Sequence, residues 1–194
     1  IIRYIGLTLA IITTVGIVSG IAMRHNIQVR HVTIASSTLP EQFDGIRIAH
    51  ITDLHLGNLS PRDKYLNKII RQLQTLNPDI LCFTGDMFNL TAKEVQGLDS
   101  LFSSVNAPLG RYAVMGNHDY GDYSHWSTPE AKQANLIATH EAYERLGFTL
   151  LLDKAMHIPL KDSSIGLIGV ENWSNPPFPR HGDLSEATSH FEPA

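Results

Sequence analysis

The chain has 194 residues, of which 43% are hydrophobic and 18% are charged, and its formal net charge at pH 7 is −4. This composition excludes a disordered or fibrous chain, and without a basic excess nothing indicates nucleic acid as a general partner. The single cysteine, Cys82, excludes an internal disulfide framework and a zinc site made of several thiolates. The length suits one domain with an appendage.

The first 24 residues predict a transmembrane helix. Residues 4–23 carry no charged side chain, and a helix of this length extends about 30 Å, the thickness of the hydrocarbon core of a bilayer. A buried core helix and a cleaved signal peptide are the alternatives. We therefore expect a protein of the cell membrane, single-pass or multi-pass, without deciding on which side the rest of the chain lies.

Residues 25–45 are a polar connector, and residues 46–194 are predicted to form an α/β domain. Strands and helices alternate in its first half, and strands follow one another in the second, which favours a layered domain with a parallel or mixed central sheet. Strands are expected at residues 46–51, 79–84, 111–115, 148–152, 156–160 and 165–170, of which the first two are expected to be buried, and helices at residues 60–77, 91–105 and 129–146.

Polar residues follow each of the first three predicted strands, as Asp53-Leu-His55, Gly85-Asp86 and Gly116-Asn117-His118-Asp119. In open α/β sheets the loops at the carboxyl ends of the strands converge, so these side chains are expected to meet in one place. Aspartate and histidine bind divalent transition metals, and an asparagine oxygen can complete such a site. Taken singly, each cluster is a weak signal that is more typical of an ordinary turn than of a metal site.

In this order, the three clusters resemble the signature of the calcineurin-like metallophosphoesterases, and the flanking residues are similar to the membrane-anchored bacterial branch of that family. The resemblance covers residues 45–185. It implies a calcineurin-like layered α/β sandwich with two divalent metal ions, manganese, iron, zinc or nickel. It also implies hydrolysis of phosphomonoesters or phosphodiesters, with lipid or cell-envelope phosphate esters as reasonable substrates. The alternative is a non-catalytic module that keeps the fold and binds metal or a partner.

The resemblance also implies a role for each residue of the three clusters. Asp53 and His55 would bind the first metal, Asp86 would bridge both metals, and Asn117 would bind the second. His118 would be the catalytic histidine rather than a metal ligand. Asp119 would hold the imidazole of His118, in line with the general use of a carboxylate to fix a histidine tautomer.

The sequence departs from the family pattern toward its end. The family completes its metal sites with a later histidine in a strand-end His-Asp motif and with a Gly-His-x-His motif, and neither occurs here. His190 is the one candidate substitute. We therefore interpret the chain as a piece of a longer protein whose sandwich is incomplete at the C-terminus. As given, it is expected to bind metal weakly and to be inactive.

Overall fold

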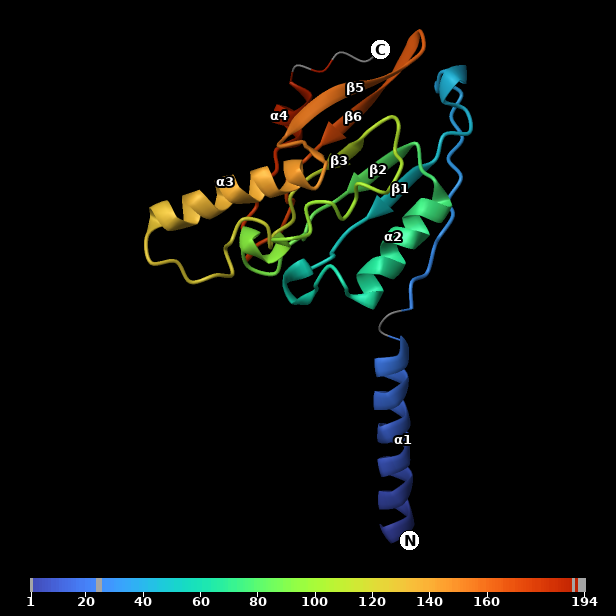
Figure 1. The fold of residues 1–194 in the computed structure, drawn as a ribbon, viewed down its shortest axis with the longest axis vertical. Coiled ribbons are helices and arrows are strands. Elements are labelled where there is room, and N and C mark those ends of the chain that lie inside the picture. Colours follow the sequence, from blue (N-terminus) through green and yellow to red (C-terminus); the bar gives the residue numbers. More distant parts are fainter. Residues whose placement is uncertain (1, 24–25, 190, 192–194) are drawn as a thin grey trace. The chain divides into compact units, whose positions relative to one another are not determined.

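The computed structural model describes residues 2–23, 26–189 and 191, and the chain forms two compact units, Ile1–Ile34 and Ala35–Ala194 (Figure 1). The helices are α1 (Ile2–Met23), α2 (Lys64–Leu76), α3 (Pro129–Arg145) and α4 (Leu184–Thr188), with short 3₁₀ turns η1 (Glu41–Phe43), η2 (Leu56–Asn58) and η3 (Ala92–Val95). The strands are β1 (Ile48–Ile51), β2 (Ile80–Phe83), β3 (Arg111–Ala113), β4 (Thr149–Leu150), β5 (Lys154–Leu160) and β6 (Ser163–Gly169).

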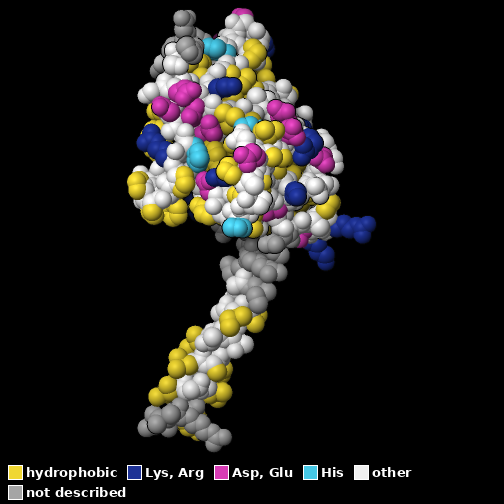
Figure 2. All heavy atoms as spheres, turned by 90° about the vertical axis from the view of Figure 1, so that its left-hand side faces the viewer, with side chains coloured by type: hydrophobic (Ala, Val, Ile, Leu, Met, Phe, Trp, Pro, Cys, Tyr) yellow, Lys and Arg dark blue, Asp and Glu magenta, His cyan; other side chains and the backbone are white. Residues whose placement is uncertain are grey.

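The N-terminal unit consists chiefly of helix α1, which confirms a continuous helix over this part of the sequence. Side chains 4–20 of this helix are exposed, and Figure 2 shows hydrophobic side chains along it. Among the described residues, however, no helix combines the length and the apolarity that a membrane crossing requires. The predicted transmembrane helix is therefore not supported.

Strands β1 to β4 form one sheet in the order β1-β2-β3-β4, and all of them are parallel. The register aligns Ile51 of β1 with Phe83 of β2, and Phe83 with Ala113 of β3. The carboxyl ends of β1, β2 and β3 therefore lie side by side at one edge of the sheet. This arrangement confirms the predicted α/β fold with a parallel sheet, and it gathers the loops that follow the three strands.

The two faces of the sheet are covered by different elements, because successive side chains of a strand point to opposite faces. Ile80 belongs to a cluster with Tyr112, Leu151 and Ile158, against which further side chains of the antiparallel β5–β6 hairpin pack. Phe83 lies on the other face, where its ring is 6.0 Å from that of Tyr143 in α3. The sheet is thus the middle layer between the hairpin and α3.

Helix α2 shows how local sequence sets the ends of an element. The Asp63 carboxylate accepts the backbone N–H groups of Tyr65 and Leu66 and caps the first turn. The last turn ends at Asn77, which is left-handed with φ 44°. Residues 60–62 precede the helix as a loop, so the helix begins later than its Ser-Pro signal predicted.

The predicted helix over residues 91–105 is wrong. Only η3 forms there, and the remainder is a series of turns. Gly97 has φ 80°, which ends helical geometry after one turn. Leu98, Phe102 and Val105 are nevertheless buried, and their spacing of four and three residues is one that a helix would also give. Helix α4 was not predicted from the sequence.

Candidate metal centre

The loops after β1 and β2 present their polar side chains from left-handed backbone positions. Asp53, His55 and Asp86 have φ of 55°, 45° and 58°, a region that non-glycine residues adopt only at a cost. Backbone hydrogen bonds hold the two loops together: the N–H of Asp53 donates to Gly85 O at 3.0 Å, and that of His55 donates to Asp86 O at 3.1 Å. The candidate ligands therefore sit on backbone that the neighbouring loop fixes.

Two glycines let the second and third loops approach at the level of the main chain. Gly85 has φ 96°, and a Cβ atom there would lie 2.9 Å from Met115 C and would collide with the nitrogen of Gly116. A Cβ atom on Gly116 would lie 2.6 Å from Asp86 N and would collide with the Asp86 carboxylate. Neither position has room for a side chain, which explains both glycines of the motifs.

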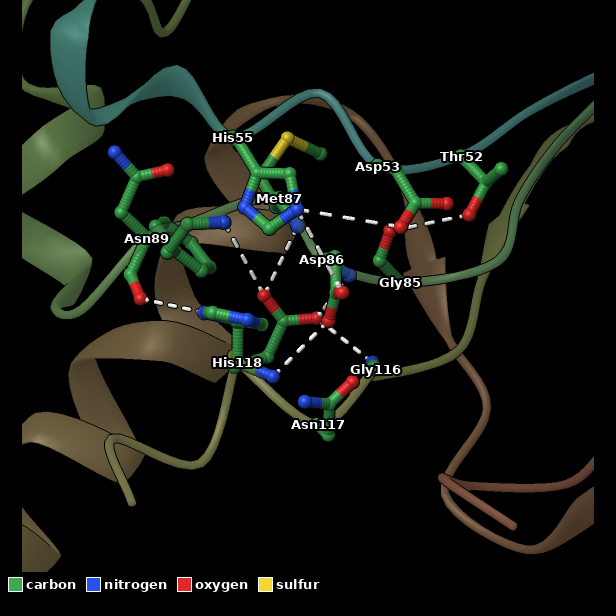
Figure 3. A network of polar contacts seen from close by, with 12 residues as sticks. Thr52, Asp53, His55, Gly85, Asp86, Met87, Asn89, Gly116, Asn117 and His118 are labelled. Carbon is green, nitrogen blue, oxygen red and sulfur yellow. Dashed lines mark hydrogen bonds and ion pairs between the residues drawn. The ribbon is translucent and has the colours of Figure 1, made fainter. Parts of the chain in front are cut away.

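Histidine and carboxylate side chains converge between these loops (Figure 3). His55 Nε2 lies 3.7 Å from Asp86 Oδ2 and 4.0 Å from Asp53 Oδ1. The ring of His118 meets that of His55 edge-on, with 4.8 Å between centroids. One ligand atom each of His55, Asp86 and His118 lies within 4.8 Å of the others. Imidazole nitrogen and carboxylate oxygen are ligands that divalent transition metals bind. The residues present therefore suit the divalent metal that the sequence predicted.

Asn117 lies on the same loop as His118 and borders the cluster (Figure 3). Its side-chain Nδ2 donates to the hydroxyl of Tyr123 at 2.7 Å. The ring of Tyr123 in turn lies 4.4 Å from that of His118, centroid to centroid. Tyr123 therefore restrains both residues, a role that no spacing in the sequence indicated.

Asp119 is buried beneath the cluster, with 1% of its surface exposed. Its two carboxylate oxygens accept the N–H groups of Asp86, Met87, Phe88 and Gly116 and the hydroxyl of Tyr143, at 2.8–3.3 Å. Burial raises the pKa of Asp119 to about 6, against the lowering effect of hydrogen bonds from Gly116, Tyr143 and Phe88. All of these partners are donors, and the ionised carboxylate is the form that accepts them all.

The expectation that Asp119 holds the imidazole of His118 is wrong in this structure. His118 Nδ1 instead lies 2.8 Å from the backbone oxygen of Asn89, whereas the Asp119 oxygens are directed at the loop backbone and Tyr143. Because a carbonyl oxygen only accepts, Nδ1 must carry the proton, and Nε2 of the neutral ring keeps its lone pair. Sequence reasoning missed Asn89 because its contribution comes from the main chain. His190, the other candidate ligand, lies outside the described residues.

The sequence profile of the calcineurin-like phosphoesterases matches residues 46–187. The chain therefore belongs to the calcineurin-like phosphoesterase family, a family of metal-dependent phosphoester hydrolases. This confirms the resemblance carried by the three polar clusters.

Curated relatives match the chain over about half of its length. It is 43% identical over 96 residues to the UDP-2,3-diacylglucosamine pyrophosphatase LpxG of Chlamydia trachomatis, covering 47% of this chain and 29% of that protein. It is 35% identical over 101 residues to the uncharacterized metallophosphoesterase YkuE of Bacillus subtilis, covering 51% of this chain and 35% of that protein. A transmembrane protein with metallophosphoesterase domain of Danio rerio is 33% identical to it over 89 residues, covering 46% of this chain and 20% of that protein. The matches thus span about a third or less of each relative.

Proposed function

We propose that this protein is a dinuclear metallophosphoesterase that hydrolyses phosphomonoesters or phosphodiesters. The observation that carries the proposal is the convergence of His55, Asp86 and His118, with Asp53 beside them, at the carboxyl edge of the sheet. Family membership supplies the reaction class. Divalent ions in such a centre supply positive charge for a phosphate group and activate water for its hydrolysis.

Each side chain then has a proposed role. Asp53 and His55 would hold one ion, Asp86 would be shared by both ions, and Asn117 would hold the second. His118 acts as a general base through Nε2, the nitrogen that the bond from Nδ1 to Asn89 leaves with a lone pair, and it can act as an acid only after Nε2 has taken up a proton. Asp119 acts on the backbone that carries Asp86 rather than on the substrate.

The test is a hydrolysis assay of the full-length protein with an aryl phosphate and a bis-aryl phosphodiester, in the presence of Mn²⁺ and after chelation. Asp86→Asn is expected to lose both metal binding and turnover, because it removes the charge that both ions share. His118→Ala is expected to keep metal binding but to lose a factor of about 10²–10⁴ in rate. Asp99→Asn, an exposed surface ion-pair variant, is the matched control and should retain activity.

Two outcomes would contradict this proposal. Turnover that survives both chelation and Asp86→Asn would show that the reaction does not use this centre. Calorimetric Mn²⁺ binding that Asp86→Asn abolishes, without turnover of either ester, would instead establish the non-catalytic metal-binding module.

We further propose that the protein works at a membrane, on a lipid or cell-envelope phosphate ester. The support comes from the names of two relatives, one acting on a diacylated sugar nucleotide and one called a transmembrane protein, and from the exposed apolar side chains of α1. In a flotation assay with phospholipid vesicles, the wild-type chain should float. Ile11→Lys combined with Val15→Lys should reduce the floating fraction, and an equal fraction in the variant would contradict the proposal.

A further inference from the structure

The peptide group between Asn89 and Leu90 contacts His118 on one side and a carboxylate on the other. Its carbonyl oxygen accepts from His118 Nδ1 at 2.8 Å, and its N–H, which belongs to Leu90, donates to Glu94 Oε1 at 2.8 Å. The peptide unit is planar, so fixing the direction of the N–H also fixes the direction of the carbonyl. The orientation of the Asn89 carbonyl is therefore set by Glu94.

Glu94 accepts hydrogen bonds from further peptide groups of this loop. Its Oε2 accepts the N–H of Asn89 at 2.6 Å, and its Oε1 also accepts the N–H of Thr91 at 3.1 Å. Three consecutive N–H groups thus converge on one carboxylate. Bonds to an ionised acceptor are stronger than neutral ones, and bonds in series polarise one another. A carboxylate on the Leu90 N–H consequently makes the Asn89 oxygen a better acceptor for His118.

Gly57 in η2, two residues after the first cluster, lies close to this carboxylate. A Cβ atom on Gly57 would lie 2.6 Å from Glu94 Cδ and 2.7 Å from the side-chain Nδ2 of Asn89. Gly57 follows His55 closely in the chain, so Glu94 is packed between the loop that carries His55 and the loop that contacts His118. It offers no atom to the cluster of His55, Asp86 and His118 itself.

We propose that Glu94 is a positioning residue for His118: through the Asn89–Leu90 peptide it fixes the Nδ1–H tautomer and the orientation of the imidazole. The catalytic consequence of this role rests on the proposed phosphoesterase function. The effect of Glu94 on the tautomer does not rest on that function, because the tautomer is a property of the folded chain without metal or substrate. Glu94 belongs to none of the polar clusters that the sequence singled out.

The test reads the tautomer of His118 by ¹⁵N nuclear magnetic resonance on the metal-free protein with labelled histidine, the signal being assigned with His118→Gln. The wild type is expected to show the Nδ1–H form. Glu94→Gln replaces one accepting oxygen by an NH₂ group that opposes an N–H, and the ratio of the Nδ1–H to the Nε2–H form should fall about tenfold. Glu94→Asp, which keeps the charge on a shorter side chain, should restore part of that ratio.

Asp63→Asn is the matched control, because Asp63 also accepts consecutive backbone N–H groups but caps α2. It should leave the His118 tautomer unchanged. Gly57→Ala provides a second approach if Glu94→Gln does not fold, since the added methyl group displaces the Glu94 carboxylate, and it should lower the same ratio.

Two results would overturn the inference. One is an Nε2–H tautomer in the wild type. The other is an unchanged tautomer ratio in a folded Glu94→Gln or Gly57→Ala variant. A protein that shows the Glu94-dependent tautomer but hydrolyses no phosphate ester would refute the proposed function and leave the positioning role intact.

Discussion

Asp53, His55 and Asp86 all occupy the left-handed region of backbone conformation. For a residue with a side chain this costs roughly 1–2 kcal/mol, and such strain collects at functional sites where the surrounding structure holds it in place. Here the holding group is Asp119, which accepts the N–H groups of Asp86 and the two residues after it. The buried Asp119 carboxylate thus stabilises the strained backbone that positions the Asp86 side chain.

Gly85→Ala should destabilise the fold by more than backbone strain alone. At this position the added methyl group must adopt φ 96° and also collides with the backbone at Gly116. Gly97→Ala is the matched control, because Gly97 also has a positive φ, 80°, but has nothing within 4 Å of its Cβ direction. The difference between their free energies of unfolding, measured by urea titration, isolates the contact between the loops. Equal losses would show that the two loops are not packed this closely in solution.

At the residue scale, the sequence identified side chains but not main-chain partners. Asp53, His55, Asp86 and His118 were predicted to converge because each follows a strand of a parallel sheet, and the structure brings them together. The Asn89 carbonyl could not be predicted, since every residue has one and only the folded loop directs it at His118.

At the scale of elements, α3 supports the site through a buried polar stripe. Asn135, Thr139 and Tyr143 recur every four residues and are all buried. Asn135 Oδ1 accepts the N–H of Ala92 at 3.0 Å, and the hydroxyl of Tyr143 donates to Asp119 at 2.8 Å. The helix thus contacts both Ala92, in the segment that follows the cluster Gly85-Asp86, and Asp119, the last residue of the third cluster.

Tyr143→Phe is expected to lower the free energy of unfolding by about 1.5–3 kcal/mol, because it removes a buried donor to an ionised carboxylate. Tyr112→Phe is the matched control. It loses a hydroxyl that donates to the neutral Leu109 carbonyl, and its loss should be about 0.5–1.5 kcal/mol. Chemical denaturation measures both values. A smaller loss for Tyr143→Phe than for Tyr112→Phe would contradict the importance given to the bond with Asp119.

The end signals of α3 predicted its start correctly, whereas those of α2 placed its start a few residues too early. Helix α3 has Thr128 as a cap and Pro129 at its first position, and it begins where predicted. Residues 91–105 have apolar spacing too, but Gly97 interrupts them and the buried side chains belong to turns. Periodicity reports which residues are buried, and a helix follows only when the backbone between them permits it.

At the scale of the whole molecule, the candidate centre lies entirely within the unit Ala35–Ala194. The centre brings Asp53 and Asp86 to within 4.0 Å of one imidazole nitrogen, so two carboxylates lie near each other. Like charges in one site disfavour each other. A divalent ion removes this repulsion and binds only the folded arrangement, so metal binding and folding stability are linked.

Mn²⁺ should therefore raise the melting temperature of the chain. An ion present at 100 times its dissociation constant adds about 2.7 kcal/mol to the stability, which corresponds to a shift of roughly 5–11 °C for a domain of this size. Asp86→Asn should abolish the Mn²⁺-induced shift, since it halves the carboxylate charge at the centre, whereas Asp99→Asn should show the wild-type shift because Asp99 pairs with Arg145 on the surface. The metal-induced shift, rather than the baseline melting temperature, is compared between variants, because removing a repelling charge also changes the metal-free protein. A shift of equal size in Asp86→Asn would mean that the ion binds elsewhere on the chain.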